Sequence, residues 1–164
     1  MKIGASEVNG LLNRRNVLTG GAALAAAATI SSNVSLAGNA MTYDEAAAST
    51  WVPMRADGGL RELVRYATLA ANSHNTQPWS FKIEKNRISI LPDFSRRCSA
   101  VDPDDHHLFA SLGCAAENLV HAAAALGYKA TCSLGADAAA TIEVALEPSE
   151  PRRSDLFEAI PRRR

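Results

Sequence analysis

Residues 70–81 read AANSHNTQPWSF and separate two segments with different periodicities. Before them, Leu60, Leu63, Val64 and Ala67 recur at three- and four-residue steps, a pattern that predicts an amphipathic helix ending near the start of the stretch. After them, apolar and polar residues alternate, as they do in a half-buried strand. The stretch itself fits neither pattern, so we predict a loop that joins a helix to a strand.

The alternation after the loop predicts a β-hairpin over residues 79–91. Lys85 and Asn86 form its turn, and Pro92 and Asp93 break the pattern at its end. The residues expected on its apolar side are Trp79, Phe81, Ile83, Ile88 and Ile90.

The longest predicted helix begins near Pro103 and is ended by Gly127. Asp102 or Asp104 can cap its first turn. Asn118 is expected to be a structural amide that faces the partner of this helix. The buried stripe is expected to contain Leu108, Leu112, Ala115, Ala116, Leu119, Val120 and Ala123.

The remaining elements complete a mixed architecture. Thr42 can cap a short helix near the start of the folded region, and Ser154 can cap a final short helix. The segments YKATCSL and TIEVALE, residues 128–134 and 141–147, predict two further strands. The order helix, hairpin, long helix, two strands indicates an α+β domain rather than alternating βαβ units.

Composition narrows the classes of function. The chain has 164 residues, a formal net charge of zero, and three cysteines without a C-x-x-C pair. The zero net charge provides no global field that attracts nucleic acid, so we expect no nucleic-acid partner, and the cysteine spacing gives little support to a zinc site.

Cys114 falls within the apolar pattern of the long helix and is expected in the core. A disulfide between Cys98 and Cys132 is possible in an exported protein.

His106 and His107 stand beside several aspartates, which raises the question of a metal site. Adjacent helical positions diverge by about 100°, so the two imidazoles do not easily share a ligand face. Helix capping and solvation explain the cluster better, and we predict no metal site.

The N-terminal segment has the layout of a signal peptide. Arg14 and Arg15 precede a short apolar stretch, which small residues follow. The arrangement N-R-R-N-V-L resembles a bacterial twin-arginine signal. We therefore expect residues 1–40 to direct export through the twin-arginine machinery to the periplasm, with cleavage after Ala37 or Ala40. The alternative is an alanine-rich amphipathic helix that belongs to the fold.

The loop over residues 72–77 offers many hydrogen-bonding groups and little charge. Asn72, Asn75 and Gln77 each present a carbonyl oxygen and an NH2 group, and Ser73 adds a hydroxyl. Such a set suits a neutral, planar, heteroatom-rich ligand such as a flavin, a nucleobase or a sugar-like chain. The alternative is a structural turn in which the amides satisfy one another and the nearby backbone.

Two segments resemble the nitroreductase family of FMN-dependent α+β oxidoreductases. SHNTQPWSF resembles the N-x-Q-P-W signature of that family, and SLGCAAENLVHAAAALGYKA is similar to its long central helix; together they cover most of residues 60–133. The twin-arginine start, the DPD before the helix and the AIPRRR near the end are similar to the Acg-like branch, in which two nitroreductase-like halves are fused. The resemblance implies a nitroreductase-like fold with a mixed or antiparallel sheet and a long central helix, here incomplete.

The resemblance also implies a binding site for FMN. Residues that match Ser73, Asn75 and Gln77 lie at the flavin in this family, and Asn72 is expected beside them. Arg163 is the best match to the arginine that holds the FMN phosphate by paired, charge-assisted bonds, and a merely solvated arginine run is the alternative. We predict no catalytic side chain, because the cofactor carries the chemistry.

These expectations define three regions: a signal peptide over residues 1–40, a nitroreductase-like half-domain over residues 41–147, and a linker with the start of a second, missing half over residues 148–164. The chain is expected to be a fragment, or to form a dimer or pseudo-dimer with a second half. The expected function is hydride transfer through FMN, from NADPH or NADH to a small-molecule electron acceptor. The alternatives are flavin binding without turnover and an inactive truncated product.

Overall fold

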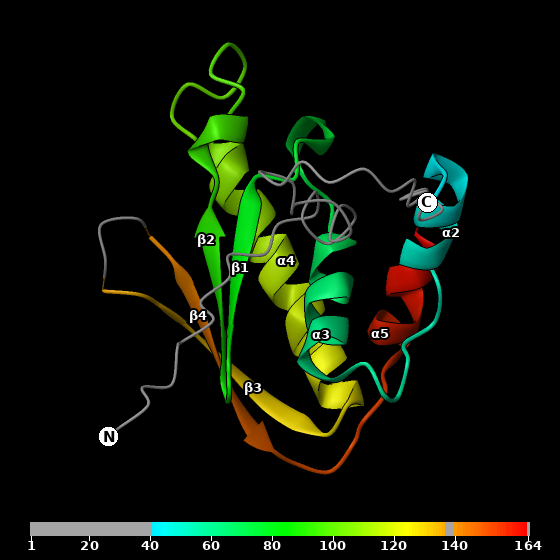
Figure 1. Ribbon diagram of the computed structural model, residues 1–164. Coiled ribbons are helices and arrows are strands. Elements are labelled where there is room, and N and C mark those ends of the chain that lie inside the picture. The colour runs from blue at the N-terminus through cyan, green and yellow to red at the C-terminus, as the bar shows by residue number, and fades with distance from the viewer. Residues whose placement is uncertain (1–40, 137–139, 164) are drawn as a thin grey trace, which may run out of the picture.

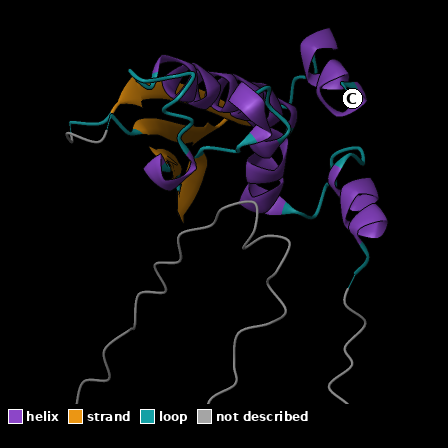
Figure 2. Cartoon of the chain, turned by 90° about the horizontal axis from the view of Figure 1, so that it is seen from above, coloured by secondary structure: helices purple, strands orange, loops and turns teal. Residues whose placement is uncertain are grey.

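The computed structural model describes residues 41–136 and 140–163. The predicted signal peptide, with its expected cleavage after Ala37 or Ala40, lies outside the described residues, as does Arg164. Four strands form one antiparallel sheet in the order β1-β2-β4-β3, and the α-helices gather on one side of it (Figure 1, Figure 2). The predicted α+β architecture is confirmed.

Each helix and strand predicted over the described residues is present. The strands are β1 (Trp79–Glu84), β2 (Arg87–Pro92), β3 (Tyr128–Leu134) and β4 (Ile142–Pro148). The α-helices are α2 (Tyr43–Thr50), α3 (Gly59–Thr68), α4 (His106–Ala125) and α5 (Asp155–Ala159). Short 3₁₀ helices are η1 (Ser73–Asn75), η2 (Phe94–Arg96) and η3 (Ile160–Arg162).

β2 continues through Pro92, where the sequence pattern predicted a break. Pro92 pairs with Trp79, and the Asp93 N–H donates to the Pro78 carbonyl at 3.0 Å. This bond makes Trp79 and Pro92 a non-hydrogen-bonded pair, so the proline nitrogen points away from β1. β4 pairs with β2 only over residues 87–90. Neither neighbouring strand has an acceptor facing the nitrogen of Pro92, so the sheet loses no hydrogen bond at this proline.

The sheet has one apolar and one polar face. The apolar face packs against α4 and contributes the buried Trp79, Phe81, Ile88, Ile90, Val144 and Leu146. On the opposite face the Ser89 hydroxyl donates to Glu143 at 2.9 Å, and Arg87 lies 3.7 Å from the same carboxylate. This alternation fixes the register of the strands, because a shift of one residue would move the charged groups into the core.

α4 begins at His106, later than predicted, because Asp105 has a left-handed φ of 58°. Asp102 caps the helix: its carboxylate accepts hydrogen bonds from the backbone N–H groups of His107 and Leu108, both at 3.0 Å. Burial raises the pKa of Asp102, but these two bonds and the His107 ring outweigh burial and hold the pKa below its usual value. The capping interpretation of this cluster is confirmed, and the described residues contain no group of three His, Cys, Asp or Glu side chains placed to hold a metal ion.

The predicted apolar stripe of α4 is buried, apart from Val120, which is half-buried. Cys114 is exposed, so its predicted place in the core is wrong. Each helical residue turns by about 100°, which places Cys114 on the side opposite the stripe. Cys98 and Cys132 are free thiols, and the possible disulfide between them is not formed.

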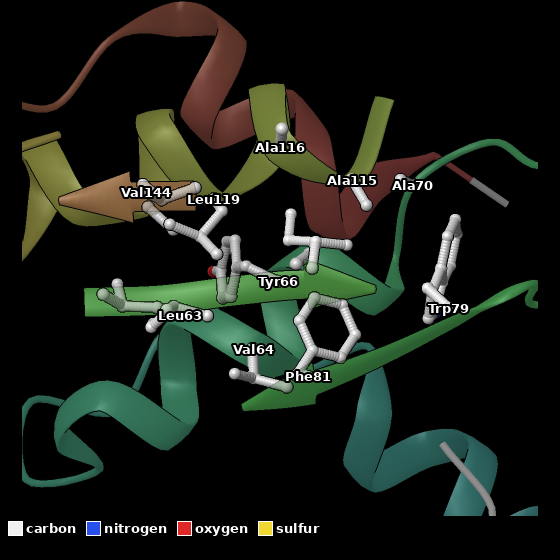
Figure 3. Close-up of a cluster of buried hydrophobic side chains, with 14 of the residues drawn as sticks. Leu63, Val64, Tyr66, Ala70, Trp79, Phe81, Ala115, Ala116, Leu119 and Val144 are labelled. Carbon is white, nitrogen blue, oxygen red and sulfur yellow. The ribbon is translucent and has the colours of Figure 1, made fainter. Parts of the chain in front are cut away.

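The core lies between the sheet and the packed pair α3 and α4 (Figure 3). The side-chain amide of Asn118 in α4 donates to the Tyr66 carbonyl of α3 at 3.1 Å, which confirms its role as a structural amide. α4 is long and apolar enough to meet the usual criterion for a membrane-spanning helix, but helices buried in the cores of other proteins meet that criterion too. Side chains from four elements meet in the core, among them Leu63, Tyr66, Phe81, Leu119 and Val144.

The C-terminal segment packs on the same core. Phe157 of α5 is 1% exposed and stacks on Tyr66, with 5.2 Å between the ring centroids. Ser154 caps α5 as predicted, since its Oγ accepts from the Phe157 N–H at 3.2 Å, and Thr42 caps α2. The division of the chain at residue 147 into a half-domain and a linker stays a prediction.

A buried ion pair fixes the segment that joins α2 to α3. Glu62 is 1% exposed and Arg65 is 8% exposed, and Arg65 Nη2 lies 2.6 Å from Glu62 Oε2. Arg65 Nη1 donates to the carbonyl oxygens of Thr50 at 2.7 Å and Val52 at 2.9 Å. Arg55 donates to Glu62 from its backbone N–H and its side chain. Burial raises the pKa of Glu62, but the hydrogen bonds from Arg65 and Arg55 outweigh burial and lower the pKa to about 2.

Replacement of Glu62 by glutamine is expected to lower the free energy of unfolding at neutral pH by roughly 3 kcal/mol, because Arg65 stays buried without a carboxylate. The pKa of Glu62 is depressed in the fold, so the wild-type carboxylate stabilises the fold above its ordinary pKa of 4.5. That contribution is lost as the pH falls from 4.5 to about 2. Urea unfolding measured across this pH range tests both statements.

The matched control for this test is Glu147→Gln, because Glu147 is exposed on β4. The control is expected to unfold like the wild type at every pH. A Glu62→Gln variant that is as stable as the wild type at neutral pH contradicts the role of the ion pair.

Candidate functional site

A hollow of about 420 Å³ opens where α3 leads into the amide-rich loop. Four of the five residues predicted to hold a cofactor line it: Asn72, Asn75, Gln77 and Arg163. Arg163 reaches the hollow from the C-terminal segment, and its Nη2 donates to the Leu69 carbonyl, 94 positions earlier in the chain, at 2.6 Å. The volume lies within the range of about 300–1,000 Å³ that is typical of small-molecule sites.

The loop backbone is left-handed at three residues other than glycine. His74, Asn75 and Gln77 have φ values of 50°, 52° and 55°. Asparagine tolerates this region, but glutamine disfavours it, so the surroundings must hold the backbone of Gln77 in place. Strained residues of this kind cluster at ligand-binding and active sites.

Hydrogen bonds from two sides hold the loop in this shape. Asn72 Oδ1 accepts from the Gln77 N–H at 2.8 Å, and Asn72 Nδ2 donates to the Ala70 carbonyl at 3.2 Å. The Ser111 hydroxyl of α4 accepts from the Ser73 N–H at 3.1 Å. The loop is therefore positioned by α4 as well as by its own side chains.

The two interpretations of the amide loop apply to different residues. Asn72 uses both ends of its amide within the loop, so the structural-turn interpretation holds for it. Gln77 is buried, with 6% of its surface exposed. Its Nε2 makes a long hydrogen bond of 3.4 Å to Asn75 Oδ1. Its Oε1 has no hydrogen-bond partner among the described residues. Trp79 Nε1 is also unpartnered there, but Trp79 does not line the hollow. A buried acceptor without a partner costs about 1–3 kcal/mol, which a ligand that donates a hydrogen bond would remove.

Arg163 supplies the charge of the hollow. The other side chains in the described lining are uncharged. Its bond to the Leu69 carbonyl holds the guanidinium at the end of α3, and its other side-chain N–H groups make no hydrogen bond within the described residues. Arg162, in contrast, lies 3.9 Å from Glu158. The hollow thus combines a neutral carboxamide wall with one cation at its edge.

Ser73 does not share the hollow with the other four predicted residues. It lines a separate, small depression together with Arg96, Arg97 and Asp102. Its predicted contact with a cofactor stays a prediction.

Tyr43 and Trp51 also line the hollow, and sequence reasoning missed both. Tyr43 is the first residue of α2, and Trp51 directly follows the last. No local pattern relates them to residues 72–77. Arg65 of α3 binds the carbonyl oxygens on either side of Trp51, and this contact between distant segments helps to bring the end of α2 to the hollow. The sequence offers one weak signal: aromatic residues make up 5% of the chain, so each of them stands out.

Comparison with known proteins adds two relatives. No protein-family model matches the sequence. Two curated proteins of Mycobacterium tuberculosis, from strains CDC 1551 / Oshkosh and ATCC 25618 / H37Rv, are similar to it. Each is named "Putative NAD(P)H nitroreductase". Each is 31% identical over 110 residues, a match that covers 64% of this chain and 32% of the relative. The chain thus spans about a third of the length of the curated relatives that it matches.

Replacement of Gln77 by methionine is expected to raise the free energy of unfolding of the ligand-free chain by about 1 kcal/mol. Methionine is also unbranched and of similar size, so the backbone strain stays while the unpartnered buried oxygen is removed. Urea unfolding of the two proteins measures the difference.

His74→Gly is the matched control, because His74 is a neighbouring exposed residue whose side chain makes no hydrogen bond within the described residues, and glycine accepts its positive φ. Its free energy of unfolding is expected to stay within about 0.5 kcal/mol of the wild type. If Gln77→Met is less stable than the wild type, the Gln77 amide is part of the folded architecture and not a vacant ligand contact.

Proposed function

We propose that this chain is part of an FMN-dependent oxidoreductase of the nitroreductase family and that the hollow beside η1 binds the flavin. The similarity to the two mycobacterial relatives supports the family, and an antiparallel α+β fold with a long helix is compatible with it. The observation that carries the proposal is the convergence of Asn75, Gln77 and Arg163 on one hollow, where the buried Gln77 Oε1 has no partner in the part of the chain that the structure describes.

The donors and acceptors of the hollow fit a flavin. An isoalloxazine presents carbonyl and N–H groups along one edge, and the carboxamides of Asn75 and Gln77 both donate and accept. The phosphate of FMN is anionic, and a guanidinium such as that of Arg163 binds phosphate through paired, charge-assisted hydrogen bonds. Asn72 is occupied in holding the loop, so we assign it a positioning role.

FMN, when bound, supplies hydride transfer between NADPH or NADH and a small-molecule acceptor. The described lining of the hollow contains no carboxylate, imidazole or thiol, so its side chains bind and orient rather than exchange protons. This composition fits a protein whose contribution is placement of the reacting groups.

A second nitroreductase-like half, fused or separate, completes the site in this proposal. Asn75 and Arg163 are exposed at the hollow, and the matched segment covers 32% of each relative. The paired Arg14 and Arg15 support export by the twin-arginine route to the periplasm, as in the Acg-like branch.

Flavin binding without turnover is the alternative function. The predicted export favours it, because free nicotinamide cofactors are scarce outside the cytoplasm. Anaerobic addition of NADPH or NADH to the FMN-loaded chain, followed by a quinone as electron acceptor, separates the two functions. Loss of the visible flavin absorbance and its return with the acceptor show turnover, and a spectrum unchanged by the nicotinamide shows binding alone.

The full chain is expected to bind FMN and to retain it through gel filtration. Replacement of Arg163 by alanine is expected to weaken FMN binding by roughly tenfold to a hundredfold, because a hydrogen bond to a charged group contributes about 1.5–3 kcal/mol. Riboflavin has no phosphate, so its binding is expected to stay unchanged. Calorimetric titration with both compounds gives the two affinities.

Arg162→Ala is the matched control, since Arg162 lies towards Glu158 and does not line the hollow. It is expected to bind FMN like the wild type. If the full chain binds neither flavin, the proposed function is wrong. If Arg163→Ala weakens FMN and riboflavin equally, the phosphate role of Arg163 is wrong.

A further inference from the structure

We infer that Tyr43 and Trp51 form an aromatic wall that stacks on the flat face of a planar heterocycle, whose edge the carboxamides of Asn75 and Gln77 bind. The inference rests on the proposed function, which makes the isoalloxazine of a flavin the occupant. It assigns α2, a helix outside both segments that resemble the nitroreductase family, to the binding site.

A planar heterocycle needs two kinds of contact. Its hydrogen-bonding groups lie in the ring plane and point outward at the edges, whereas its faces are apolar and favour contact with other π-systems. Carboxamides alone therefore bind an edge but leave both faces in water. The hollow supplies both kinds of contact, because its carboxamides come from the loop and its aromatic side chains come from Tyr43 of α2 and from Trp51, which follows α2.

The exposure of Tyr43 supports a ligand contact. Tyr43 is 85% exposed, which is high for a large aromatic side chain, and yet it borders the hollow that the carboxamides line. Tyr43 and Trp51 are eight positions apart, about 12 Å along a helix of 1.5 Å rise per residue. Both side chains nevertheless line the same hollow, so a ring system bound there lies between them.

The backbone beside each aromatic residue is held by hydrogen bonds, which favours a preorganised site. At one end of α2, the Thr42 N–H donates to Glu45 Oε2 at 2.8 Å in a capping box beside Tyr43. At the other end, Arg65 binds the carbonyl oxygens of Thr50 at 2.7 Å and Val52 at 2.9 Å, the residues on either side of Trp51. The buried guanidinium therefore fixes the backbone of Trp51 against α3.

Riboflavin is the probe that isolates ring stacking, because it carries the isoalloxazine without the phosphate that Arg163 is proposed to bind. Tyr43→Ala in the full chain is expected to weaken riboflavin and FMN binding alike, by roughly tenfold, the size typical of aromatic stacking on a heterocycle. Tyr43→Phe keeps the ring and is expected to bind both compounds like the wild type.

Flavin fluorescence gives a second readout that does not depend on activity. Contact with tyrosine or tryptophan quenches flavin emission, so riboflavin bound at saturation is expected to be brighter in Tyr43→Ala and in Trp51→Phe than in the wild type. Leu156→Ala is the control, because Leu156 is a large exposed apolar residue that does not line the hollow. It is expected to change neither affinity nor emission.

The outcomes separate this inference from the proposed function. If the wild type binds neither flavin, the proposed function fails and the aromatic wall fails with it. If the wild type binds riboflavin and Tyr43→Ala binds it with the same affinity and emission, the aromatic wall is wrong while flavin binding stands. If Tyr43→Phe loses as much affinity as Tyr43→Ala, the hydroxyl and not the ring makes the contact, which also overturns the inference.

Discussion

The buried guanidinium of Arg65 is the constraint on which the candidate site depends. A charge in a protein interior is tolerated only where partners surround it. The partners of the Arg65 guanidinium are the Glu62 carboxylate and the carbonyl oxygens of Thr50 and Val52. These contacts hold the connection between α2 and α3 against α3. Since Trp51 lies between the two carbonyl groups, the same contacts place one wall of the hollow.

The amide loop combines a strained backbone with an unsatisfied acceptor. Gln77 has a left-handed φ of 55°, and its buried Oε1 has no partner among the described residues. Both features lower the stability of the ligand-free fold, so the surrounding structure must impose them. The Asn72 amide and the Ser111 hydroxyl of α4 do this by binding the loop backbone. A loop under such constraint fits a site where binding requires fixed geometry.

α4 contributes to the site through its flanks rather than through its apolar stripe. Ser111 contacts the loop, and Asn118 contacts the Tyr66 carbonyl near the end of α3. Both helix-flank residues join α4 to the segments that border the hollow, whereas the stripe from Leu108 to Ala123 packs in the core. The long helix thus supports the core with one set of residues and the loop with another.

The sequence by itself determined the elements and the residue types available for a ligand. These came from the periodicities around residues 60–71 and 79–91, the caps at Thr42 and Ser154, a cap at Asp102 or Asp104, and the cluster of carboxamides. Only the tertiary structure decided which of these residues meet. It placed Asn75, Gln77 and Arg163 at one hollow and Ser73 at another, and it added two aromatic residues, Tyr43 of α2 and Trp51 just after it. Periodicity encodes the direction of a side chain relative to its own element. The meeting of residues 94 positions apart depends instead on loop dihedral angles and on helix packing, which no short pattern encodes.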